Sequence, residues 1–400
     1  MEMAELRALL TADGLRLLDG MPPVSTSADV AREVTRLRAA GHSPDLVSAV
    51  VGQARLRTRG AEKFGPLAAR MLFTRAGLEQ STRLAVAALH AGRFRDAGLA
   101  HIADLGSGIG GDALGFAGLG LGVLAVDADE VTAAIAAYNL APFGQAVEVR
   151  HARAEDVDVS TGGSGIDGVW LDPARRTAGH TETSRLSRPE DYSPALDWAF
   201  DLATRRPTGI KLGPGFDRER LPAHGEAQWI TADGSTLELV LWSGALARPG
   251  VGRAALVLAD GHAHELTAPA DSEDEPVRAL GAFVHEPAGS VIRARLVGDV
   301  ARALDAGPIA PGIAYLTGDA ALTSPFVSSF RVREQVPADV KKLARALRER
   351  GIGRLEIKKR GVDVDPAALR TRLGLKGEGS ATLILSRVGS TRIALLADRV

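Results

Sequence analysis

One stretch of the chain combines an acid with closely spaced glycines, a pattern suited to holding a nucleotide. It reads Asp104-Leu-Gly-Ser-Gly-Ile-Gly-Gly-Asp112 and follows the apolar run 99–103. Glycines at this spacing let the backbone turn tightly and bring its N–H groups close to a ligand. A buried strand, this turn and a helix over 112–119 would open a nucleotide-binding βα unit.

The glycines by themselves do not identify the ligand. Gly106, Gly108 and Gly111 fit the dinucleotide fingerprint, and a second acid, Asp127, follows Gly111 by 16 residues, a spacing that suits either S-adenosylmethionine (SAM) or NAD. Asp127 ends the apolar run 122–126, where an acid can accept hydrogen bonds from both ribose hydroxyls. Asp104 favours SAM, because Asp-x-Gly-x-Gly-x-Gly resembles motif I of the class I SAM-dependent methyltransferases.

This resemblance implies a cofactor-binding set around the turn. In the family, the acid and the glycine loop hold the methionine end of SAM, which carries a free ammonium group. An acid after the third strand lies near the adenine amino group, and Glu155 or Asp156 matches it, although a solvated turn explains these two residues equally well. The implied set is Asp104, Gly106, Ser107, Gly108, Gly110, Asp127, Ala128, Glu155 and Asp156.

A second group of residues points to the chemical step. The expected strand 166–171 is followed by Asp172-Pro-Ala-Arg-Arg-Thr177. Asp172-Pro173 resembles the (Asp/Asn)-Pro-Pro-(aromatic) motif of amino-group methyltransferases. A carboxylate and a backbone carbonyl that accept both N–H bonds of an aryl amine can aim its delocalised lone pair at a methyl donor, and proline fixes that carbonyl. We predict Asp172, Pro173 and Arg175 as catalytic residues.

The motif departs from the amino-methyltransferase pattern, because Ala174 and Arg175 replace the second proline and the aromatic residue. Asp-Pro-(Pro/Ala)-Arg also occurs in RNA 5-methyluridine methyltransferases, which need a cysteine nucleophile. This chain has no cysteine, so that route is closed. Arg175 and Arg176 could hold a phosphate or another anion. Lys211, on the next expected strand, could face this site or solvent.

Composition sets the remaining limits. The chain has 400 residues, enough for two or three domains, and a net charge of −1 that creates no global field for nucleic acid. The lack of cysteine excludes disulfides and thiolate metal sites. His262, His264 and Glu265 fit a surface turn better than a metal site, so we predict no metal. No leader peptide or membrane span is evident, which predicts a cytoplasmic protein without a membrane partner.

The pattern of apolar residues predicts an α/β protein. Helical spacing dominates residues 1–95, and strands alternate with helices over 99–243, as in a parallel, doubly wound sheet. Asp233-Gly234 joins two further strands into a hairpin. Residues 326–400 read as a compact α/β unit. Its basic side chains cluster, and they suit either phosphate binding or an ordinary solvated surface: Lys341, Lys342, Lys358, Lys359 and Arg360.

Taken together, the motifs resemble those of bacterial class I SAM-dependent methyltransferases that carry a C-terminal THUMP-like domain. The resemblance rests on Leu72-Phe-Thr-Arg75, Leu78-Glu-Gln80, the two acid motifs, Glu286-Pro287 with Val291-Ile-Arg-Ala294, and Leu355-Glu-Ile-Lys-Lys-Arg-Gly361. It implies an N-terminal helical region, a Rossmann-like sheet and a small C-terminal α/β domain. The expected boundaries are 1–95, 96–260 for the SAM-binding domain, 261–325 for a connecting α/β segment, and 326–400 for the THUMP-like domain.

THUMP domains bind RNA in tRNA-modifying enzymes, so the resemblance implies RNA as a partner. The sequence therefore predicts SAM-dependent methylation of tRNA or rRNA at a base amino nitrogen. Two alternatives stay open: methylation of a small molecule or protein, in which case the basic residues are incidental, and a non-catalytic SAM- or RNA-binding protein. The pattern specifies no oligomeric state.

Overall fold

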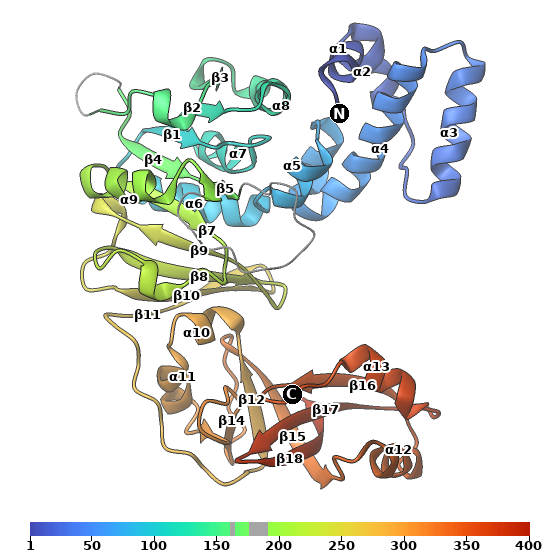
Figure 1. Ribbon diagram of the computed structural model, residues 1–400, viewed down its shortest axis with the longest axis vertical. Helices are drawn as coiled ribbons and strands as arrows, with labels where there is room; N and C mark the ends of the chain where they lie inside the picture. Colours follow the sequence, from blue (N-terminus) through green and yellow to red (C-terminus); the bar gives the residue numbers. More distant parts are fainter. Residues whose placement is uncertain (161–164, 176–190) are drawn as a thin grey trace. The chain divides into compact units, whose positions relative to one another are not determined.

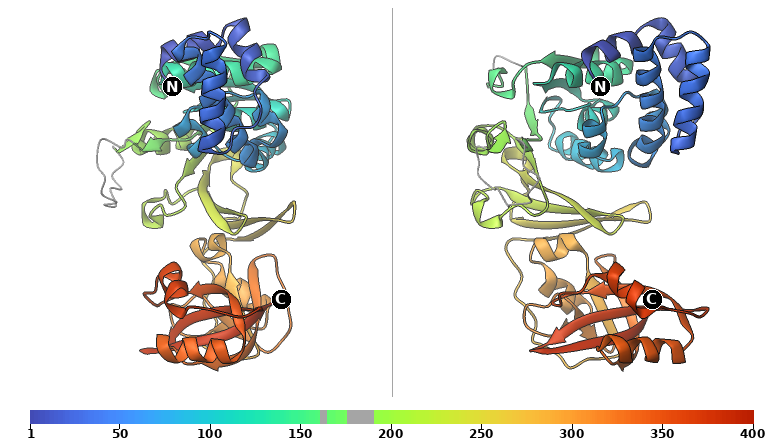
Figure 2. Two further views of the ribbon diagram at one scale, coloured as in Figure 1. Left: turned by 90° about the vertical axis from the view of Figure 1, so that its right-hand side faces the viewer. Right: turned by 45° about the vertical axis from the view of Figure 1, so that its right-hand side comes forward.

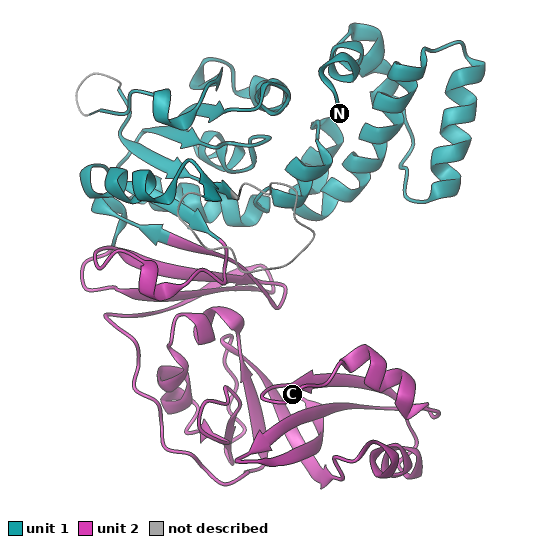
Figure 3. Cartoon of the chain, in the orientation of Figure 1, with its two compact units in different colours: residues 1–212, 241–247 teal, residues 213–240, 248–400 magenta. Residues whose placement is uncertain are grey.

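The computed structural model describes residues 1–160, 165–175 and 191–400 (Figure 1). The contacts divide the chain into two compact units (Figure 3). Unit 1 comprises Met1–Leu212 and Leu241–Ala247, and unit 2 comprises Gly213–Val240 and Arg248–Val400. The predicted SAM-binding domain, 96–260, contains parts of both units, and the four sequence-based boundaries stay a prediction.

The N-terminal part of unit 1 is helical, with α2, α3 and α1 packed on the long helix α4. Sequence signals set the helix starts: Thr26 and Asp29 form the expected capping box of α3, and Ser43 caps α4 ahead of Pro44. The helices are α1 (Met3–Leu9), α2 (Ala12–Asp19), α3 (Ser27–Ala39), α4 (Pro44–Phe64), the 3-10 turn η1 (Gly65–Arg70), α5 (Arg75–Gln80) and α6 (Leu84–Asp96).

Unit 1 continues as a parallel sheet in the order β3–β2–β1–β4–β7, with helices between the strands. The strands are short apolar runs, as expected of a sheet covered on both faces. In chain order the elements are β1 (His101–Leu105), α7 (Gly111–Gly118), β2 (Gly122–Asp127), α8 (Glu130–Leu140), η2 (Ala141–Ala146), β3 (Val147–His151), η3 (Ala154–Asp156), β4 (Gly168–Leu171), the β5 (Ala174–Arg175) and β6 (Tyr192–Ser193) pair, α9 (Leu196–Arg205), β7 (Thr208–Leu212) and η6 (Gly244–Leu246).

The register of this sheet brings the ends of four strands into line. Leu105 in β1 is opposite Val126 in β2 and Leu171 in β4, and Leu171 is opposite Ile210 in β7. One residue further, the same register places Gly106, Asp127, Asp172 and Lys211 in one row. The strand order reverses at β1, the place where ligands bind in open α/β sheets.

Unit 2 begins with the strands β8 (Glu226–Ala232), β9 (Ser235–Trp242), β10 (Arg253–Ala259) and β11 (His262–Ala268), preceded by η5 (Arg218–Arg220). Asp233 and Gly234 have φ of 49° and 72° and form the predicted tight turn between β8 and β9. The expectation that His262, His264 and Glu265 lie on a turn was wrong. Asp260 and Gly261 take up the two positive-φ turn positions, so these three residues begin strand β11.

The rest of unit 2 is a second sheet in the order β13–β14–β12–β15–β18–β17–β16. Strands from the segment 261–325 pair directly with the C-terminal strands, because β12 runs antiparallel to β15. The elements are β12 (Phe283–Pro287), α10 (Gly289–Arg293), α11 (Val297–Ala303), β13 (Gly307–Pro308), β14 (Leu316–Gly318), β15 (Val327–Val336), α12 (Val340–Glu349), β16 (Ile352–Lys359), α13 (Pro366–Leu373), β17 (Gly379–Val388) and β18 (Thr391–Arg399).

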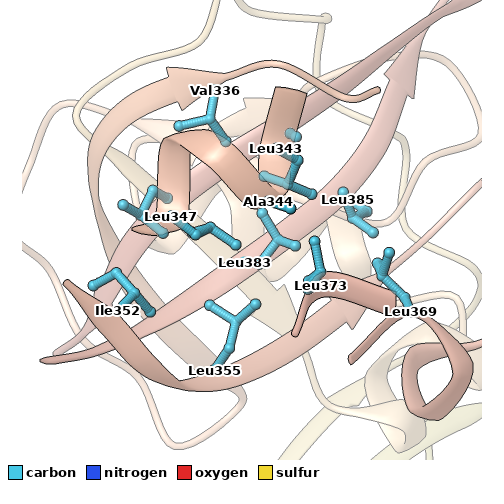
Figure 4. Packing of buried hydrophobic residues seen from close by; sticks show 12 residues of the cluster. Val336, Leu343, Ala344, Leu347, Ile352, Leu355, Leu369, Leu373, Leu383 and Leu385 are labelled. Carbon is cyan, nitrogen blue, oxygen red and sulfur yellow. The ribbon is translucent and has the colours of Figure 1, made fainter. Parts of the chain in front are cut away.

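Helices α12 and α13 cover one face of this sheet (Figures 1 and 2). Their leucines pack against alternate residues of β16, β17 and β18, including Leu355, Leu383 and Leu385 (Figure 4). The other face packs on a second apolar cluster that contains Tyr315 and Phe330. No helix among the described residues is long and apolar enough to span a membrane.

Candidate active site

The glycine turn lies between β1 and α7 and depends on the absence of side chains. Gly106, Gly108 and Gly110 have φ of 86°, 54° and 90°, in the left-handed region that favours glycine. A Cβ on Gly106 would lie 2.9 Å from the carbonyl oxygen of Asp172. The predicted cofactor loop and the predicted catalytic motif are therefore in direct backbone contact.

Asp104 is buried behind this turn, with 1% of its surface exposed. Neither carboxyl oxygen has a hydrogen-bond partner within the described part of the chain, and the same holds for the buried hydroxyl of Ser107. Burial raises the pKa of Asp104 well above its ordinary value, and the nearby Asp112 and Asp172 raise this pKa further. A buried acid without a partner fits a site that a cationic ligand completes.

Asp127 closes the turn from the end of β2. One of its oxygens accepts from the Gly108 N–H at 2.9 Å, and the other accepts from the Asp129 N–H at 2.9 Å. Burial raises the pKa of Asp127, while these two backbone donors lower it. Ala128, which follows, is exposed. The carboxylate is thus fixed beside the glycine turn, where the sequence places the ribose.

The two candidates for the adenine contact differ in their surroundings. Both belong to the short turn η3, which follows β3. Glu155 is half-buried and pairs with Arg153 at 3.3 Å, whereas Asp156 is exposed. Neither carboxylate is distinguished by burial in the way that Asp104 is.

Asp172 follows β4 and faces Lys211 from β7. Lys211 Nζ donates to Asp172 Oδ2 at 2.6 Å, so Lys211 lies at the site and not in solvent. The exposed fractions of the two side chains are 13% for Lys211 and 33% for Asp172. Pro173 is buried, and Arg175 contributes backbone to the β5–β6 pair. Arg176 lies outside the described residues, and so does most of the polar segment 178–195, which the sequence predicts to be a loop of a length suited to substrate gating.

Behind the ion pair runs a chain of polar residues that the sequence motifs did not reveal. Lys211 Nζ also donates to Thr82 Oγ1 at 3.0 Å, and Thr82 Oγ1 donates to Asp112 Oδ2 at 2.7 Å. Asp112 Oδ1 lies 2.8 Å from His90 Nδ1. Burial raises the pKa of Asp112, but the hydrogen bonds of His90 and Thr82 and the charges of His90 and Lys211 together lower the net pKa. The sequence offered one signal for this chain of residues, which is the position of His90 on the apolar face of α6.

Two buried amides hold residues 72 and 73 in place, one from α8 beside the glycine turn and one from α4. Asn139 of α8 accepts from the Leu72 N–H at 2.8 Å and donates to the carbonyls of Leu72 and Ile109 at 3.0 and 2.9 Å. Gln53 of α4 makes a reciprocal pair with the backbone of Phe73 at 2.7 and 3.0 Å. Ile109 belongs to the glycine turn, so Asn139 connects the N-terminal helices to the cofactor loop.

The predicted RNA-binding residues of the C-terminal domain fall into two classes. Lys341 and Lys342 are exposed at the start of α12, and Lys359 is exposed at the end of β16. Lys358 and Arg360 instead form ion pairs with Glu286 of β12, at 3.0 and 3.4 Å. Strands β15, β18 and β17 lie between β12 and β16, so β12 and β16 would be about 19 Å apart in a flat sheet. The sheet therefore curls to bring these charged groups together.

Comparisons with known proteins agree with this arrangement. Residues 327–399 match the family model described as THUMP domain-like, and residues 2–60 match a Domain of unknown function (DUF8688). A crystal structure from Porphyromonas gingivalis W83, described provisionally as that of a methyltransferase, has a TM-score of 0.67 at 18% identity. The match covers 94% of this chain and 99% of that one, and at this identity it establishes the fold.

The family assignment rests on the sequence comparison. Uncharacterized SAM-dependent methyltransferases from two strains of Mycobacterium tuberculosis are 33% identical to this chain over 363 residues. The match covers 89% of this chain and 96% of each relative. The cofactor is SAM, as the sequence predicted, and the chain belongs to the SAM-dependent methyltransferases with a THUMP-like C-terminal domain.

Proposed function

We propose that this methyltransferase acts on structured RNA, tRNA or rRNA, and that it methylates an exocyclic amino nitrogen of a base. The observation that carries the proposal is the position of Asp172-Pro173. It follows β4 and touches the glycine turn through the contact between Gly106 and the Asp172 carbonyl. A substrate amine held there would lie next to the methyl donor.

The residues around the turn fit SAM. SAM supplies a methyl group already activated on a sulfonium, so the protein needs to bind and orient but does not need a metal. Asp104 offers the ammonium group of SAM a buried carboxylate that has no other partner among the described residues. Asp127 faces the ribose, and Glu155 or Asp156 remains the candidate for adenine.

Asp172 and the Pro173 carbonyl orient the target amine. An aryl amine is a weak nucleophile because its lone pair is delocalised into the ring. Accepting both N–H bonds fixes the direction of that lone pair, and correct orientation alone can lower a barrier by several kcal/mol. The buried proline keeps the second acceptor in place. Arg175 remains a candidate for an anionic group of the substrate.

The RNA part of the proposal rests on the C-terminal domain. Its THUMP-like match and the exposed Lys341, Lys342 and Lys359 suit phosphate binding. The pairing of Lys358 and Arg360 with Glu286 favours the second candidate, a small-molecule or protein methyltransferase, because paired charges bind phosphate weakly. Charge reversal at Lys341, Lys358, Lys359 and Arg360 separates the two: unchanged activity on RNA would exclude the RNA anchor.

Transfer of labelled methyl groups from SAM to total RNA, protein and metabolite fractions tests the proposal. We expect label in RNA and its loss in Asp172→Ala, with SAM binding retained. Label in another fraction alone would support the second candidate. Absence of label in all three would support a non-catalytic binding protein, and turnover by Asp172→Ala would remove Asp172 from its role.

A further inference from the structure

Lys211 occupies a position that no methyltransferase motif of this chain predicted. Its ammonium group bridges two acceptors, Asp172 Oδ2 at 2.6 Å and Thr82 Oγ1 at 3.0 Å. The register of β4 and β7 accounts for this, because it sets Asp172 and Lys211 side by side one residue beyond the last paired residues. Such an arrangement limits the rotation of the Asp172 carboxylate.

The charges around this contact show why a cation is needed. The charges of Asp112 and Asp172 both disfavour ionisation of Asp104, and Lys211 interacts favourably with Asp104 and Asp112 as well as with Asp172. Lys63, which donates to the carbonyls of Glu79 and Ser81, is near enough to Lys211 for their charges to repel. Lys211 directly contacts the predicted catalytic acid, Asp172.

The buried residues behind Lys211 impose a direction on the hydrogen bonds. Ionised Asp112 can only accept, so Thr82 must use its single hydroxyl hydrogen toward Asp112. The oxygen of Thr82 then has only lone pairs to offer Lys211. His90, held 4.4 Å from the Trp170 ring and 2.8 Å from Asp112, anchors the far end. The chain from His90 to Thr82 thus fixes the ammonium group from behind.

From this geometry we propose that Lys211 is a positioning residue: it holds the Asp172 carboxylate ionised and oriented toward the substrate amine, and the His90–Asp112–Thr82 chain holds Lys211. The inference rests on the role of Asp172 in the proposed function. It adds two features that the Asp-Pro motif does not include: Lys211 on β7, and the chain of hydrogen bonds that connects Lys211 to His90 on α6.

The sharpest test compares two substitutions at Thr82. Thr82→Val keeps the shape and removes the hydroxyl, whereas Thr82→Ser keeps the hydroxyl and removes a methyl group. With labelled SAM and total RNA, Thr82→Val should lower kcat about tenfold, the loss expected of one charge-assisted hydrogen bond. Thr82→Ser should stay within about twofold of the natural protein. Calorimetry should show unchanged SAM affinity in both.

Lys211→Met should lower kcat further, and Lys211→Arg should recover part of the loss. If Lys211→Met keeps natural kcat while Asp172→Ala is inactive, the inference fails and the proposed function stands. If Asp172→Ala is active, the proposed role of Asp172 fails first. Equal losses in Thr82→Val and Thr82→Ser would also overturn the inference, since packing would then explain both.

A readout without substrate covers the case in which no RNA is methylated. Urea unfolding of Lys211→Met, Asp172→Asn and the double variant forms a cycle that isolates the interaction between the two side chains. We expect a coupling of at least about tenfold in the unfolding equilibrium constant, whereas exposed ion pairs give at most about fivefold. Additive effects would show that the two residues are not coupled.

Discussion

Replacing Asn139 by leucine should damage both the fold and the cofactor loop. Leucine has the same branching and the same number of side-chain heavy atoms but no polar atoms, so it removes three hydrogen bonds in a site where the side chain is 5% exposed. The Leu72 N–H and the carbonyls of Leu72 and Ile109 lose this partner. Each buried group left unpaired costs about 1–3 kcal/mol, so we expect a stability loss of about 3 kcal/mol or more.

The same substitution should weaken SAM binding. Ile109 lies in the glycine turn, and without Asn139 the turn must be ordered when the cofactor binds. A lost hydrogen bond of about 1–1.5 kcal/mol corresponds to roughly tenfold weaker binding. Urea unfolding measures the first effect, and calorimetry with SAM measures the second.

Gln53→Leu is the matched control for Asn139→Leu. It removes the two hydrogen bonds to Phe73 but none to the glycine turn, so stability should fall by about 2 kcal/mol or more while SAM affinity changes by less than about threefold. The reasoning is refuted if both variants weaken SAM binding equally, or if Asn139→Leu loses less than about 1 kcal/mol of stability.

Three further predictions follow from the charges. Folding raises the pKa of Asp104, so the stability of the cofactor-free protein should fall as the pH rises from about 4 through that raised pKa. Asp104→Asn should therefore raise Tm at pH 7 and weaken SAM binding at least tenfold. A lower Tm would contradict this prediction. A cationic ligand beside Asp104 should lower its raised pKa, so SAM binding should release a proton at a pH near that raised pKa. The calorimetric enthalpy measured over a pH series should then vary with the ionisation enthalpy of the buffer, and an enthalpy independent of buffer at every pH would count against Asp104 as the ammonium partner. Reversing the charges of Lys341 and Lys342 should weaken RNA binding and lower the slope of its salt dependence by about one unit for each phosphate that is no longer neutralised. Glu286→Gln should strengthen RNA binding, because it removes the ion pair of Arg360 and leaves Lys358 with Glu356 as its ion-pair partner. A gel-shift titration at several salt concentrations measures both effects.

Much of the fold could be predicted from local patterns. The strand, glycine turn and helix around 101–118 depend on residues that are adjacent in sequence, and so do the helix caps at Thr26 and Ser43. The residue types within the two acid motifs also made these motifs recognisable in the sequence. The turn at Asp260-Gly261 was missed because the histidines after it resemble surface residues, although positive φ at both positions lets a strand resume at once.

The sequence by itself determined the family, the cofactor and the strand ends from which the predicted site is built, because each depends on a short run of residues. Only the tertiary structure decided which side chains meet there. Lys211 and Asp172 are 39 positions apart, and the register of β4 and β7 brings them together. Thr82 is 129 positions from Lys211 and reaches it from the segment between α5 and α6. Likewise, only the curled second sheet brings Glu286 to two of the five predicted RNA-binding residues.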